Sequence, residues 1–169
     1  MITLINKFID ICRFRAGPQD LPHSRFLLVL IIILYSIVGY IVTPIEATIP
    51  KVISSVIDTA MIIGFCYAGL WIRSMTNRGV QTITALTGTG VIFGLVSIGL
   101  FVLFPDLRNE EPTVFSSILI LALVMWNIAV FGHVLKSALD IPFWAGIGIA
   151  VLYVYTSLRV TSVIYVAHA

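Results

Sequence analysis

The sequence has little of the charge that soluble proteins place on their surface. Only 11% of its 169 residues are charged, the formal net charge is +2, and there are two cysteines. A soluble domain carries about 25% charged residues. The low charge excludes a disordered chain and a nucleic-acid binder with a basic surface, and the two distant cysteines exclude a disulfide-rich scaffold.

Motifs for catalysis and metal binding are also missing from the sequence. It contains no GxSxG, HExxH, P-loop or CxxC motif. The three histidines, His23, His133 and His168, lie too far apart in the predicted topology to share a metal or a haem. Cys12 and Cys66 have no partner motif, and Cys66 lies within an apolar run that favours simple packing. We therefore predict no enzymatic activity, no cofactor and no metal.

What the sequence has in abundance is apolar residues. They make up 59% of the chain, or about 100 residues, and the mean hydropathy is +1.07. A membrane-crossing helix needs about 20 apolar residues, so the composition predicts roughly five crossings. The order of residues agrees with this number, since apolar runs bounded by Pro, Gly and charged residues occupy 26–42, 52–72, 81–104, 113–135 and 143–166.

These runs predict an all-α fold, a polytopic bundle of five transmembrane helices. We divide the chain into a cytoplasmic segment, 1–25, and a transmembrane domain, 26–169. Gly17, Pro18 and Pro22 interrupt helix formation before the first span, and Ser24 is placed to cap it. Residues 1–25 mix charged and apolar side chains and do not resemble a cleavable signal peptide.

The first residues predict a short amphipathic helix that lies on the membrane surface. Their apolar side chains recur at helical spacing, and the charged ones fall elsewhere. The predicted apolar face consists of Ile2, Ile5, Ile9 and Cys12, with Phe8 beside them. A frayed terminus is the alternative.

The distribution of Lys and Arg predicts the orientation in the membrane. One side holds seven of the ten cations: Lys7, Arg13, Arg15, Arg25, Arg73, Arg78 and Lys136. The other side holds Lys51, Arg108 and the acidic loop at 105–112. We predict a bacterial inner-membrane protein with a cytoplasmic N-terminus and an external C-terminus.

Two charges, Asp58 and Arg159, lie inside the predicted spans. A charge at that depth costs about 2.5–3.5 kcal/mol on insertion scales unless it is paired or hydrated. Both residues lie at a similar distance from the external surface, so we predict an ion pair that joins the second and fifth spans. A proton or ligand site at Asp58, or unpaired side chains that extend to the surface, are the alternatives.

Asn127 and His133 are the other polar residues at depth, both in the fourth span. Their six-residue separation places them on different helix faces, so they do not predict one shared site. A hydrogen-bonded packing role is the simpler interpretation of each.

Small residues recur at four-residue spacing on two spans. Ala60, Gly64 and Ala68 lie on the second, and Gly90 and Gly94 form a GxxxG motif on the third. Such spacing lets two helices approach closely. We predict packing within the chain, with contact between copies in a homo-oligomer as the alternative.

The layout of five closely spaced helices resembles the Yip-domain family of small integral membrane proteins. The resemblance rests on Pro22, the LTGTGVIFG segment of the third span and the WNIAVFGHVL segment of the fourth. It implies an all-helical bundle without catalytic activity. The family's eukaryotic members act in membrane trafficking with small GTPases, and the short connectors here leave little room for such a contact.

Together these features predict a non-enzymatic integral membrane protein. Its expected role is that of a structural, assembly or accessory partner in a membrane complex, with the lipid bilayer and other membrane proteins or a second copy as partners. The alternative is a small component of a transporter or channel that uses Asp58. A water-filled cavity that reaches Asp58 would favour transport, whereas a dry contact would favour the structural role.

Overall fold

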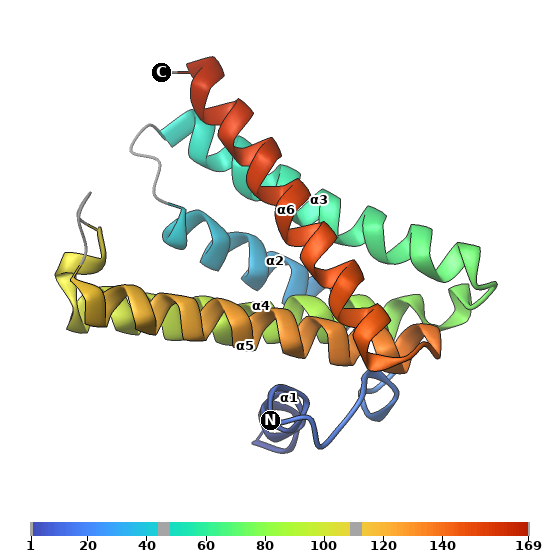
Figure 1. The fold of residues 1–169 in the computed structure, drawn as a ribbon. Helices are drawn as coiled ribbons and strands as arrows, with labels where there is room; N and C mark the ends of the chain where they lie inside the picture. The colour runs from blue at the N-terminus through green and yellow to red at the C-terminus, as the bar shows by residue number, and fades with distance from the viewer. Residues whose placement is uncertain (1, 44–47, 109–112, 169) are drawn as a thin grey trace.

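The computed structural model describes residues 2–43, 48–108 and 113–168, and every element in these ranges is helical (Figure 1). The described ranges contain six α-helices and three short 3-10 turns, in the order α1 (Ile2–Cys12), η1 (Pro18–Asp20), α2 (Arg25–Val42), α3 (Thr48–Ile72), η2 (Thr76–Arg78), α4 (Gly79–Leu103), η3 (Pro105–Arg108), α5 (Val114–Leu139) and α6 (Phe143–His168).

Helices α2 to α6 are long and apolar enough to cross a membrane. They have 18 to 26 residues, which at 1.5 Å per residue gives about 27 to 39 Å, close to the thickness of a hydrocarbon core. The five predicted spans are therefore confirmed. Helix α5 runs four residues beyond its predicted end at 135, and α3 begins four residues before its predicted start at 52.

Side-chain caps explain several of the observed boundaries. The Ser24 hydroxyl accepts a hydrogen bond from the Leu27 amide, which confirms the predicted cap of α2. Thr113 caps α5 in the same way by accepting from the Ser116 amide. At the other end of α5, Asp140 takes the left-handed conformation that ends many helices.

Helix α4 is the central element of the bundle. It lies beside α5, packs closely against α2, and also contacts α3 and α1 (Figure 1). Its first half is buried on all sides, including four threonines, Thr82, Thr84, Thr87 and Thr89. Each of these hydroxyls donates to the carbonyl four residues earlier in the chain. Because these hydroxyls are satisfied locally, the threonines can be buried in an apolar core.

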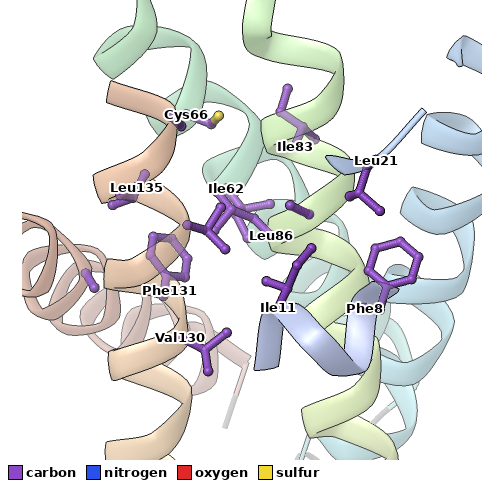
Figure 2. Close-up of a cluster of buried hydrophobic side chains, with 14 of the residues drawn as sticks. Phe8, Ile11, Leu21, Ile62, Cys66, Ile83, Leu86, Val130, Phe131 and Leu135 are labelled. Carbon is purple, nitrogen blue, oxygen red and sulfur yellow. The ribbon is translucent and has the colours of Figure 1, made fainter. Parts of the chain in front are cut away.

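Helix α1 docks against the flank of α4 and α5 and is seen end-on in Figure 1. Phe8, Ile11 and Cys12 are buried in the main core, where Ile11 lies near Leu86 and Val130 (Figure 2). The bundle covers Phe8 and Cys12 and leaves Ile5 and Ile9 57% and 40% exposed, while the side chain of Ile2 lies outside the described residues. Helix α1 has apolar side chains on two faces, and the bundle covers the face that carries the aromatic ring.

Two hydrogen bonds and one steric fit fix the position of this helix. Trp126, halfway along α5, donates its indole N–H to the Cys12 carbonyl at 3.0 Å. The Nε2 atom of His133 lies 3.0 Å from the Ala16 carbonyl oxygen. The Phe8 ring sits over Gly88, where a Cβ atom would lie 2.2 Å from it. Helix α1 is thus placed beside the middle of its neighbours.

The two ends of the bundle differ in charge. One end of the bundle contains the first residues of α2, α4 and α6 and the last residues of α3 and α5. We call it the basic end because it carries Arg25, Arg73, Arg78 and Lys136. Arg73 and Arg78 both donate to carbonyl oxygens in the last turn of α5 and the residue after it. These cations oppose the negative end of the helix dipole, which accounts for the extension of α5 to Leu139.

Candidate functional site: an intramembrane carboxylate

Asp58, on α3, accepts three hydrogen bonds from hydroxyl groups. Tyr35 of α2 donates to Oδ2 at 2.6 Å, while Ser157 and Tyr153 of α6 donate to Oδ1 at 2.7 and 3.1 Å. Both carboxylate oxygens are therefore bonded to side chains from other helices. Three O–H donors replace part of the hydration that a carboxylate loses in a membrane.

Helix geometry brings these donors together. Tyr153 and Ser157 are four residues apart on α6, so both side chains lie on the face that packs against α3. The Tyr153 ring is held by aromatic neighbours, stacked on Phe131 with 5.0 Å between centroids and tilted against Phe65 at 5.4 Å. The phenol hydroxyl is thereby directed at Asp58.

A second set of hydroxyls continues the polar contact between α2 and α3. The Ser36 and Thr59 hydroxyl oxygens lie 2.9 Å apart, and Ser55 donates to the Ser36 carbonyl at 2.6 Å. Ser55 and Thr59 are buried, and Ser54 is buried beside them. Polar groups within the bundle thus join α2, α3 and α6 by hydrogen bonds. These bonds fix the relative rotation of the three helices, which apolar packing alone would leave less defined.

The structure does not bring Asp58 and Arg159 together. Arg159 is exposed, and within the described ranges no ion pair connects it to Asp58. The physical reason is rotation about α6: Arg159 follows Ser157 by two residues, which is about 200° around a helix. Because Ser157 faces Asp58, the side chain of Arg159 leaves α6 on the opposite face of the helix.

A small cavity of about 50 Å³ adjoins the hydroxyl cluster near the middle of the spans. Its wall includes the rings of Tyr35 and Tyr153, together with Thr89 and Asn127. This volume is enough for ordered water, which needs about 10–15 Å³ per molecule. Asn127 thus faces the cavity beside the Asp58 cluster, whereas His133, on the same helix, contacts Phe14 and Ala16 in the segment that follows α1.

The cysteines lie away from this cluster and are buried and free. Burial raises the pKa of the Cys12 thiol to about 11, so the thiol form dominates at neutral pH. Among the residues that the structure describes, no group of three or more His, Cys, Asp or Glu side chains is arranged to hold a metal.

The two sets of small residues have different surroundings. Gly90 and Gly94 face α2, where an added Cβ would lie 2.5 Å from Tyr35 and 2.2 Å from Val38, respectively. Ala60, Gly64 and Ala68 are exposed instead, and a Cβ on Gly64 would meet nothing within 4 Å. The prediction of packing within the chain therefore holds for α4 and is wrong for α3.

Sequence reasoning identified Asp58 but missed its partners Tyr35, Tyr153 and Ser157. The available signal was the four-residue spacing of Tyr153 and Ser157 at a depth similar to that of Asp58. Hydroxyl residues are common in membrane helices and often bond to their own backbone, as Thr156 does to Leu152. Only the helix rotations show which hydroxyls face an acid.

Comparison of the chain with protein-family models, with curated proteins and with solved structures finds no match. The resemblance to the Yip-domain layout therefore stays a prediction.

Proposed function

We propose that this membrane protein is a non-enzymatic structural or accessory partner in a membrane complex. The observation that carries the proposal is the use of Asp58: both its oxygens are bonded to hydroxyls of α2 and α6. An acid whose two oxygens are both bonded in this way connects three helices.

The outer face of α3 supports the same role. Ala60, Gly64 and Ala68 leave a shallow strip on which another membrane helix can approach closely. The proposed occupant is a helix of another membrane protein or of a second copy of this chain. The resemblance to the Yip-domain layout points in the same direction, because it implies a bundle without catalytic activity.

Mild-detergent purification with cross-linking in the membrane tests this proposal. The wild-type chain should co-purify with a membrane partner or with itself, and Gly64→Leu should reduce that yield several-fold. Gly99→Leu is the matched control, because a Cβ on Gly99 also meets nothing within 4 Å and it lies on α4. A chain that is monomeric and alone in several detergents would contradict an assembly role.

A second candidate, a small component of a transporter or channel, is favoured by one observation. The cavity of about 50 Å³ touches both tyrosines that bond Asp58 and is lined by Asn127. Proteoliposomes that carry the wild-type chain would show proton or cation flux on this account, and Asp58→Asn would remove it. Equal, background-level flux in both samples would exclude this candidate.

We also propose that the basic end faces the cytoplasm of a bacterial cell. The support is the seven-to-two distribution of cations about the five spans. In a chain whose native cysteines are replaced by Ala, an impermeant thiol reagent added to intact cells should label Thr113→Cys and should not label Thr76→Cys. Labelling of Thr76→Cys from outside the cells would show the reverse orientation.

A further inference from the structure

The basic end of the bundle contains a pocket that the Asp58 site does not use. Its volume is about 260 Å³, close to the lower end of small-molecule sites, which is about 300 Å³. The η1 turn forms one wall through Gln19. The first turn of α4 and the last turn of α5 form the others through Arg78, Gln81 and Ser137.

The lining suits an anion. It includes the Arg78 guanidinium and the Gln19 amide, and no carboxylate lines it. The Gln81 amide and the Thr82 and Ser137 hydroxyls on its wall already donate to backbone carbonyls. The Arg78 Nη1 atom donates to the Ser137 and Ala138 carbonyls at 3.5 and 3.4 Å. These contacts hold the guanidinium at the pocket wall, and a guanidinium has five N–H donors in all.

The pocket walls are themselves held in place. Gln81 donates to the Leu21 carbonyl at 2.7 Å and to the Gln19 carbonyl at 3.4 Å, which ties the η1 segment to α4. Thr82 is fully buried and its hydroxyl donates to the Arg78 carbonyl at 2.8 Å. A ligand would therefore meet groups that are already positioned, which lowers the entropic cost of binding.

Nearby charges strengthen the positive field. Arg73 donates to the Leu139 and Asp140 carbonyls beside the pocket, and Lys136 lies one turn back on α5. The Asp20 carboxylate accepts from the Gly17 amide, and Lys7 donates to the Asp20 carbonyl. The nearest acid on the η1 wall is thus accompanied by a cation.

The position of the pocket points to a lipid as the source of the anion. Trp71 and Trp144 are 75% and 80% exposed at the same end of the bundle. Exposed Trp together with Lys and Arg marks the level of the headgroups. With the basic end on the cytoplasmic side, as proposed above, a basic pocket between helix ends is placed to recognise acidic lipid headgroups.

We propose that this pocket, with Arg78 as its principal donor, binds the phosphate group of an anionic phospholipid headgroup. The guanidinium is suited to phosphate because its planar donors match two phosphate oxygens. The Gln19 amide is the second donor of the lining, and Gln81 and Ser137 form the wall beside it. This site is independent of Asp58 and of the α3 face.

The test measures lipid binding to the full-length protein, purified in a neutral detergent, by native mass spectrometry and by thermal shift. Short-chain phosphatidylglycerol should bind and stabilise the wild-type chain more than phosphatidylcholine of the same chain length. Arg78→Gln should weaken phosphatidylglycerol binding about tenfold or more, the effect of losing a charge-assisted hydrogen bond. Arg73→Gln is the matched control and should weaken binding much less, because Arg73 adds a cation beside the pocket and donates to carbonyls at the end of α5 but does not line the pocket.

Gln19→Glu provides a second variant, because Gln19 is exposed in the η1 turn and lies outside the six α-helices. The added carboxylate should also weaken binding of phosphatidylglycerol. Stabilisation by inorganic phosphate but not by phosphatidylglycerol would overturn the lipid assignment. Equal phosphatidylglycerol affinity in the wild type and Gln19→Glu, or equal losses in Arg78→Gln and Arg73→Gln, would overturn the site itself.

Discussion

Helices α3 and α4 have 25 residues each and carry small residues at the same four-residue spacing, yet they occupy different environments. The glycines of α4 accept side chains of α1 and α2 into the space that a larger residue would fill. The corresponding residues of α3 face outward, and its inner side is joined to α2 and α6 through Asp58. Small-residue spacing permits close approach, and the rest of the fold decides whether a neighbour within the chain uses it.

The comparison is tested most strongly at Gly94. A leucine there has to displace Val38, because even a Cβ would lie 2.2 Å from the Val38 Cγ1 atom. Overpacking of this kind costs about 1–3 kcal/mol, and a side chain wedged between two helices reaches the upper part of that range. Thermal unfolding in detergent should show a lower midpoint for Gly94→Leu. Gly64→Leu should leave it unchanged, and equal midpoints would remove the distinction between the helices.

The inner side of α3 is tested by Asp58→Ala. This change removes the carboxylate that accepts from the hydroxyls of Tyr35, Tyr153 and Ser157. An unsatisfied buried group lowers the free energy of unfolding by about 1–3 kcal/mol. Asp58→Asn should cost less, because the amide oxygen still accepts. The measurement is the free energy of unfolding, with Ser157→Ala added to each variant as a double-mutant cycle. An Asp58→Ala chain as stable as the wild type would refute the connecting role of this residue.

The contact between α1 and the α4–α5 pair is tested by Trp126→Phe. Phenylalanine keeps an aromatic ring near Phe93, which stacks edge-on with Trp126 at 5.1 Å, but lacks the N–H that donates to Cys12. The loss of one such hydrogen bond costs about 0.5–1.5 kcal/mol. Hydrogen exchange should become faster in α1 and stay unchanged in α3. Trp144→Phe serves as the control, since Trp144 is largely exposed.

The smallest effect is expected where α4 connects to α5. Hydrogen bonds from Ser116 and Thr113 lower the pKa of Asp106 below its ordinary value. A carboxylate with a lowered pKa in the folded state adds stability above its unfolded value, about 3.9, and loses it as the pH falls through the folded value. Unfolding midpoints measured from pH 7 down to pH 3 should fall slightly more for the wild type than for Asp106→Asn. Parallel curves would show that the cluster adds nothing to the α4–α5 connection.

Much of this architecture was predictable from the order of residues. The five spans follow from apolar length, and the Ser24 cap follows from its position before the first span. Depth within the membrane follows from counting residues along a helix, which is why Asp58 was recognised. These properties are local, so a single sequence contains them.

Rotation about the helix axes was not predictable in the same way. Arg159 and Ser157 differ by two residues and lie at nearly the same depth, but only Ser157 meets Asp58. Helix α1 offers apolar side chains on two faces, and its buried face depends on Gly88, which leaves room for Phe8. The rotation of each helix therefore depends on packing against residues that are far away in the sequence.

The hydrogen bond from Trp126 to the Cys12 carbonyl joins positions 114 residues apart. It therefore imposes an order on biosynthesis, because α1 leaves the ribosome before α5, and the docking surface on α5 is made more than a hundred residues later. The surface on α4, where Phe8 lies over Gly88, is made earlier. Helix α1 can thus complete its contacts only after the fourth span has been synthesised.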